Sequence, residues 1–68
     1  MRFNLKCARR VKRLNQDEMA KILDISKSFY YKIENGSRNP SLKLAFKIAD
    51  VLEHNDIKEL FEMKEEVK

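Results

Sequence analysis

The chain has 68 residues, a formal net charge of +4 at pH 7, and one cysteine, one glycine and one proline. A chain of this size is near the lower limit for a self-sufficient core, and a single cysteine excludes an internal disulfide framework. No stretch approaches the roughly 20 apolar residues of a membrane span, and the basic N-terminal end lacks the apolar run of a signal peptide. We therefore expect one domain, residues 1–68, that is cytoplasmic and not attached to a membrane.

The composition favours an all-α fold, because good helix formers predominate and few segments alternate apolar and polar residues as strands do. Helical periodicity and capping signals predict a compact bundle of about five short helices, at residues 4–13, 16–23, 26–35, 41–52 and 57–63. The second and third, joined by a tight polar turn, have the layout of a helix-turn-helix.

Capping signals mark the ends of the second and third helices. Asn15 and Glu18 have the spacing of a capping box, in which each side chain bonds the other's backbone amide. Ser26 can cap the third helix. Asn35 and Gly36 end it, because glycine suits the left-handed stop.

The later helices carry similar signals. Ser41, after Pro40, can cap the fourth helix, and Asp56 with Glu59 forms a second capping box before the fifth. The fourth helix is apolar around most of its circumference, and Leu42 heads the stripe assigned to the core. The remaining apolar flank and the fifth helix suggest a dimer surface, formed by Leu44, Val51, Ile57 and Phe61. The alternative is that these residues pack internally.

The third helix has two different faces. On a wheel at about 100° per residue, Tyr30 and Ile33 point to one side. The opposite arc, roughly 140° wide, holds the polar side chains, namely Lys27, Ser28, Tyr31, Lys32 and Asn35. Lysine can donate to guanine O6 and N7, serine can donate or accept, and tyrosine can contact a thymine methyl or a phosphate. We therefore expect DNA base contacts from the first four of these residues.

The charges are unevenly distributed along the chain. Residues 1–13 hold six basic side chains and no acid, whereas the segment from residue 53 onward holds six acids and three lysines. A basic end suits a polyanion, and each phosphate contact would make binding sensitive to salt. The alternative is that these charges only solvate helix surfaces.

Six stretches form a series along the chain: LKCAR (5–9), NQDEMA (15–20), IS (25–26), KIENG (32–36), RNPSL (38–42) and LAFKIADVL (44–52). In this order and spacing they resemble the lambda-repressor and Cro type of helix-turn-helix domain, also called the Xre family. The resemblance covers nearly the whole chain and implies that it binds DNA through its third helix.

The resemblance also implies roles for individual residues. Gln16 corresponds to a family glutamine that holds a DNA phosphate, and Asn35 and Arg38 fall on the loop that grips the DNA backbone. Arg9 and Glu34 match a pair that forms a salt bridge between the first and third helices in relatives. The base-contacting positions of the family fall on Lys27, Ser28 and Lys32.

The chain departs from the family pattern at three corners. Arg13, Asp24 and Glu53 lie at or near positions where relatives often have glycine. Each corner must therefore adopt another geometry or accept a left-handed residue at some cost.

Enzyme chemistry finds no support in the sequence. There is one histidine and one cysteine, with no H-E-x-x-H, no C-x-x-C and no glycine-rich phosphate loop. We expect Cys7 to be a small apolar residue of the first helix and His54 to take part in ordinary capping at a helix end. No metal or other cofactor is expected.

These observations predict a sequence-specific binder of double-stranded DNA that regulates transcription, acting as a homodimeric repressor on a palindromic operator. Its half-sites would be centred one helical turn apart, roughly 34–36 Å. The alternative is an antitoxin-type or other protein-interaction module of the same fold with a protein partner such as a toxin, or a fragment of a longer regulator. Antitoxins of this fold usually bind DNA as well, so the two readings are compatible.

Overall fold

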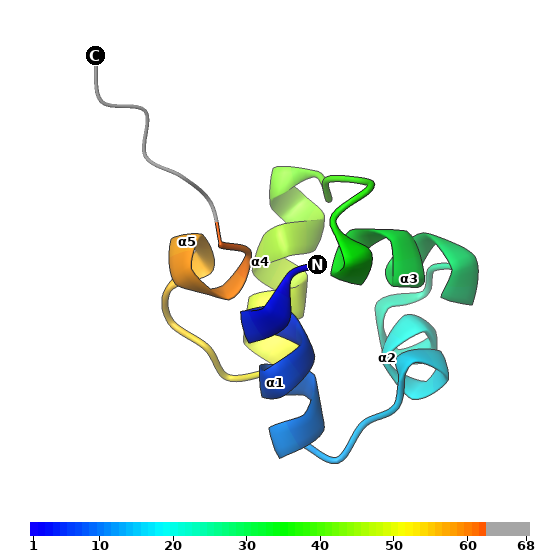
Figure 1. The fold of residues 1–68 in the computed structure, drawn as a ribbon. Coiled ribbons are helices and arrows are strands. Elements are labelled where there is room, and N and C mark those ends of the chain that lie inside the picture. The colour runs from blue at the N-terminus through cyan, green and yellow to red at the C-terminus, as the bar shows by residue number, and fades with distance from the viewer. Residues whose placement is uncertain (63–68) are drawn as a thin grey trace.

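Five helices make up the computed structural model, which describes residues 1–62 and contains no strand there. They are α1 (Phe3–Val11), α2 (Gln16–Leu23), α3 (Lys27–Asn35), α4 (Leu42–Val51) and α5 (Ile57–Leu60) (Figure 1). Helix α2 packs against α3, and α1 contacts both α3 and α5. The predicted all-α bundle, with the helix-turn-helix at its second and third helices, is confirmed. None of these helices is long and apolar enough to cross a membrane.

Three predicted N-terminal caps are present. The amide of Glu18 donates to Asn15 Oδ1 at 2.7 Å, and the amide of Asn15 donates to Glu18 Oε1 at 2.9 Å, which completes the capping box. Ser26 and Ser41 accept from the amides of the residues three positions later, at 3.0 and 3.1 Å. Because both serines keep extended backbone angles, α3 and α4 begin one residue later than predicted.

The predicted fifth helix needs correction. Helix α5 ends at Leu60, followed by a turn at 61–62, and predicted residue 63 lies outside the described part. Asp56 accepts from the amide of Glu59 at 3.2 Å, as a cap should. Its own amide, however, donates to His54 Nδ1 at 3.3 Å. His54 therefore takes the place that the capping box assigned to the Glu59 carboxylate, consistent with its predicted role at a helix end.

The three corners without glycine adopt the left-handed conformation. Arg13, Asp24 and Glu53 have φ of 58°, 57° and 54°, and Gly36 after α3 has φ of 89°. A side chain in this region costs roughly 1–2 kcal/mol for most residue types and less for aspartate. Each of these corners therefore accepts a left-handed residue, at an energetic cost that is larger for Arg13 and Glu53 than for Asp24.

The core lies between the five helices, where α1 packs on α3 and α5, and α4 packs on α2 and α5. Tyr30 and Ile33 are fully buried, as the helical wheel of α3 predicted. The core consists of Leu5, Met19, Ala20, Leu23, Tyr30, Ile33, Ala45, Ile48, Ala49, Leu52, Leu60 and Phe61. Leu42 was predicted to be part of the core stripe of α4, but it is 67% exposed. The core assignment of Leu42 is therefore wrong.

Arg2 ties together segments that are distant in the sequence. Its guanidinium donates to the carbonyl oxygens of Ile33, Arg38 (2.9 Å) and Phe61 (3.3 Å) and to Asn39 Oδ1. The same guanidinium lies 5.9 Å from the centre of the Phe61 ring. One side chain thus connects the end of α3, the loop that follows it and the end of α5.

Candidate nucleic-acid interface

Helix α3 presents its predicted polar arc to solvent. Lys27, Ser28 and Lys32 are exposed, and Tyr31 is 53% exposed. Tyr30 on the opposite face lies in the core, so the helix is anchored from behind. The first turn is fixed by the Ser26 cap and the last by Gly36 in the left-handed conformation. The four predicted base-contacting side chains therefore lie together on the free surface of one short, well-capped helix.

The loop after α3 is held in a defined shape. The Asn35 side-chain oxygen accepts from the amide of Ser37 at 2.8 Å, and the amide of Arg38 donates to the carbonyl of Lys32 at 3.2 Å. Arg2 holds the Arg38 carbonyl from the other side. Asn35 is half-buried and organises the loop, whereas Arg38 is exposed. Of the two loop residues predicted to contact phosphate, Arg38 is the one placed to present a charge.

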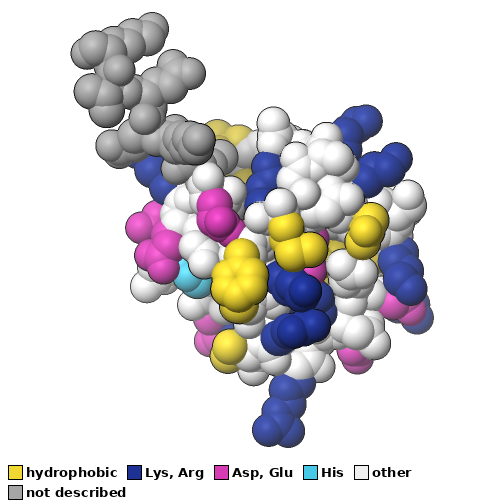
Figure 2. Space-filling model, in the orientation of Figure 1, with side chains coloured by type: hydrophobic (Ala, Val, Ile, Leu, Met, Phe, Trp, Pro, Cys, Tyr) yellow, Lys and Arg dark blue, Asp and Glu magenta, His cyan; other side chains and the backbone are white. Residues whose placement is uncertain are grey.

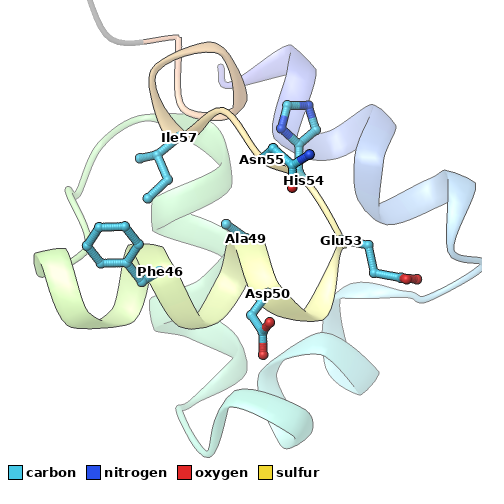
Figure 3. A pocket seen from close by; sticks show the side chains of 7 residues that line it. All are labelled: Phe46, Ala49, Asp50, Glu53, His54, Asn55 and Ile57. Carbon is cyan, nitrogen blue, oxygen red and sulfur yellow. The ribbon is translucent and has the colours of Figure 1, made fainter.

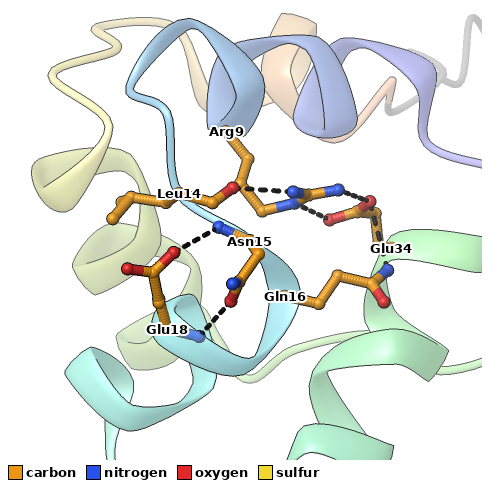
Figure 4. A network of polar contacts seen from close by, with 6 residues as sticks. All are labelled: Arg9, Leu14, Asn15, Gln16, Glu18 and Glu34. Carbon is orange, nitrogen blue, oxygen red and sulfur yellow. Dashed lines mark hydrogen bonds and ion pairs between the residues drawn. The ribbon is translucent and has the colours of Figure 1, made fainter.

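Gln16 opens α2 but turns inward. Its side-chain nitrogen donates to Glu34 Oε1 at 3.4 Å, and the residue is half-buried (Figure 4). A phosphate contact from the Gln16 side chain would require this long hydrogen bond to break.

A buried ion pair joins α1 to α3. Arg9 Nε and Nη2 donate to the two carboxylate oxygens of Glu34, each at 2.9 Å, and the two residues are 7% and 2% exposed. Arg9 Nη1 also donates to the Leu14 carbonyl at 2.7 Å (Figure 4). The pair therefore fixes the entry to α2 as well as the orientation of α3.

Burial and pairing determine the protonation states of the cluster formed by Arg9, Glu34 and Tyr30. The hydrogen bonds to Glu34 raise the pKa of Arg9, although burial opposes them. Burial alone would raise the pKa of Glu34, but polar interactions with its neighbours, led by the hydrogen bond from Arg9, outweigh it, so that pKa lies below its ordinary value. Burial and the neighbouring carboxylate also raise the pKa of Tyr30, whose hydroxyl has no hydrogen-bond partner among the described residues. At neutral pH the cluster holds an ionised pair beside a neutral phenol.

The surface charges follow the uneven distribution of the sequence. In Figure 2 several acidic side chains lie on the side where Figure 1 places α5, and lysine and arginine side chains predominate over the rest of the visible face, with a few acidic side chains at its right and lower edges. The exposed arc of α3 therefore lies on the more basic side of the molecule. Such a surface attracts a polyanion over the distance of a Debye length.

The residues predicted to form a dimer surface are only partly available. Leu44, Val51 and Ile57 are half-buried and pack against the core. Phe61 is 3% exposed, beneath the Arg2 guanidinium. Phe61 therefore cannot contribute to a surface contact, because the turn after α5 directs its ring into the bundle. The sequence reasoning also missed Arg2, whose partners lie 31 to 59 positions away and leave no local signal.

Residues 1–62 contain no group of three or more histidine, cysteine, aspartate or glutamate side chains that could hold a metal ion. Cys7 is an exposed thiol on α1. The arrangement described here offers a polar helical surface and a shaped basic loop. These features suit recognition of a nucleic acid and define a helix-turn-helix protein.

Comparisons with known proteins identify the family. The model of the family described as Helix-turn-helix matches residues 8–60. The uncharacterized HTH-type transcriptional regulator MJ0272 of Methanocaldococcus jannaschii is 47% identical over 49 residues, which cover 72% of this chain and 74% of that protein. The uncharacterized HTH-type transcriptional regulator YqaF of Bacillus subtilis is 42% identical over 52 residues, covering 76% and 68%. The chain belongs to the helix-turn-helix family, and its type is that of lambda repressor and Cro, the Xre family. This family is a non-enzymatic, DNA-binding kind.

Proposed function

We propose that the protein is a regulator of transcription that binds double-stranded DNA sequence-specifically, with α3 in the major groove. The observation that carries the proposal is the exposed polar arc of α3, backed by a fully buried face and held at both ends by caps. Family membership and two relatives named as transcriptional regulators support it.

Base recognition would come from the α3 arc. Lys27 and Lys32 can donate to guanine O6 and N7, Ser28 can donate or accept, and the exposed Tyr31 ring can contact a thymine methyl. Each good base contact is worth roughly 1–3 kcal/mol of discrimination between sequences. Arg38 and the first turn of α2 at Gln16 would hold phosphates on either side, with Asn35 shaping the loop, and these contacts add affinity without sequence information.

We further propose that the protein acts as a homodimer on a palindromic operator, because a short recognition helix reads few base pairs and two-fold half-sites double the sequence that is read. Occupying promoter DNA is sufficient for repression, whereas activation needs an additional contact with polymerase. Repression is therefore the proposed outcome of binding.

The test is selection of bound duplexes from a random DNA library at fixed salt, with the parent protein, Lys32→Ala and Lys21→Ala. Lys21 is the matched control because it is an exposed lysine on α2 that pairs with Asp17 at the surface. The parent and Lys21→Ala should enrich one two-fold symmetric site, and Lys32→Ala should lose preference at one position in each half. Equal sequence preference in all three proteins, or weak salt-sensitive binding without enrichment, would refute the assignment of α3 as the reading helix.

A further inference from the structure

The outer face of α4 carries large apolar side chains that nothing in the described part of the chain covers. Leu42 is 67% exposed and Phe46 is 58% exposed, and their spacing of four residues places them on one side of the helix. Phe46 forms one wall of a surface depression of about 270 Å³ that continues to Ile57 of α5 (Figure 3). The other lining residues are Ala49, Asp50, Glu53, His54 and Asn55.

The charges on this face change sign along the helix. Lys43 precedes Phe46 by three residues and Asp50 follows it by four, and both are exposed. Neither side chain has an ion-pair partner among the described residues. By contrast, Lys47 donates to the Leu23 carbonyl at 3.5 Å and is turned toward α2. Lys43 and Asp50 are therefore the opposite charges on this face that remain available.

A two-fold contact requires a surface that is complementary to itself. If two α4 helices lie antiparallel and cross near Phe46, Lys43 of each copy falls beside Asp50 of the other, and the exposed apolar side chains meet at the centre. An antiparallel two-fold contact needs a positive charge on one side of its centre and a negative charge on the other. Lys43 and Asp50, on either side of Phe46, provide this pattern. A different partner protein would have no reason to require it.

A second exposed apolar face, on α1, does not carry opposite charges on either side of its centre. Phe3 and Val11 are 62% and 79% exposed. Their charged neighbours on α1 are Lys6 and Arg10, and the helix has no acid. Two copies meeting there by a two-fold axis would place like charges together, which is destabilising. The charge patterns thus distinguish the two faces and favour α4 for self-association.

We propose that the outer face of α4, formed by Leu42, Lys43, Phe46 and Asp50 with Ile57 at its edge, binds a second copy of this chain in an antiparallel two-fold contact. The proposal rests on the homodimer of the proposed function and names its surface. The proposed face differs from the dimer surface predicted from the sequence. Leu44 and Val51 of that surface lie on the opposite flank of α4, and Phe61 is buried. The proposal also gives the exposed Phe46 a defined role as the central apolar contact.

The experiment is sedimentation equilibrium of the full chain without DNA over a wide range of protein concentrations. Phe46→Asp should raise the dimer dissociation constant at least about tenfold, because a central buried aromatic side chain dominates such contacts. Phe3→Asp, the matched change on α1, should leave it unchanged. Circular dichroism should show both variants folded, since both residues are exposed.

A charge exchange tests the antiparallel register. Lys43→Glu and Asp50→Lys should each weaken the dimer about tenfold, because each change places two like-charge pairs in the contact. Combining them restores opposite charges and should return the dissociation constant to within about threefold of the parent. A monomeric parent, an unaffected Phe46→Asp dimer, or a double variant weaker than either single one would each overturn the proposal. Because DNA is absent, failure here is distinguishable from failure of α3 to read sequence.

Discussion

Replacing Glu34 by glutamine is the most direct test of how α3 is held in position. The change keeps the shape of the side chain and removes its charge, so the Arg9 guanidinium loses an ionised partner while it remains 7% exposed. The Leu14 carbonyl, which accepts at 2.7 Å, is then its one remaining strong acceptor among the contacts described. An uncompensated cation in this position is the main energetic consequence of the substitution.

The expected loss of stability in Glu34→Gln is large for so small a protein. Removing one partner of a buried pair typically costs about 3–5 kcal/mol, and a chain of this size has a total stability of about 3–10 kcal/mol. The melting temperature should therefore fall by on the order of 12–40 °C. Asp17→Asn, which breaks the exposed pair with Lys21 at 3.5 Å, should cost less than about 0.5 kcal/mol and serves as the control.

The assay is urea unfolding of a double-mutant cycle made of Glu34→Gln, Arg9→Met and the combined variant. If the two side chains act as a pair, the combined variant should lose less stability than the sum of the single losses, because neither leaves an orphaned charge. Sequence preference for DNA should not change in any variant that remains folded. A Glu34→Gln protein as stable as the parent, or strictly additive losses, would refute this reasoning.

Three further predictions concern the pH dependence of stability, the left-handed corner at Arg13 and the contacts of Arg2. The lowered pKa of Glu34 means that its stabilising contribution is present above the unfolded value, about 4.3, and is lost as the pH falls through the folded value. The urea midpoint should therefore fall in acid for the parent and less so for Glu34→Gln. Arg13→Gly should raise the free energy of unfolding by about 0.5–1 kcal/mol because it relieves a left-handed arginine, whereas Arg10→Gly, inside α1, should lower it by about 1 kcal/mol. Arg2→Gln should accelerate hydrogen exchange of the Arg38 amide in the free protein, and unchanged exchange would show that Arg2 does not hold the loop.

The parts of the fold that the sequence predicted are those set by local interactions. The Asn15 box and the Ser26 and Ser41 caps each join residues three positions apart, so their spacing is visible in the sequence. The polar arc of α3 was likewise predictable, because helical periodicity depends on neighbours within two turns. Asp56 shows the limit of such reasoning. Its amide donates to His54 Nδ1 and not to the Glu59 carboxylate that the spacing predicted.

The errors concern long-range packing. Leu42 and Phe61 are both large apolar residues, and nothing in their local sequence shows that the first is 67% exposed and the second 3% exposed. Which apolar residue is covered depends on contacts between distant segments, such as the packing of α5 on α1 and α4 and the contact of Arg2 with the Phe61 ring. The role of Arg2 was hidden for the same reason, because the sequence presents it only as one of several basic residues near the N-terminus.

A short loop connects the two proposed surfaces, the exposed arc of α3 and the outer face of α4. The loop from Gly36 to Ser41 leads directly from the reading helix α3 into the Ser41 cap of α4, and Arg2 fixes that loop at the Arg38 carbonyl and at Asn39. The outer face of α4 therefore keeps a fixed orientation relative to the exposed arc of α3. In a dimer formed through α4, the distance between two reading helices would be determined by this rigid connection within each copy. If the proposed dimer forms, the contacts that hold the loop would therefore also set the spacing of the proposed half-sites.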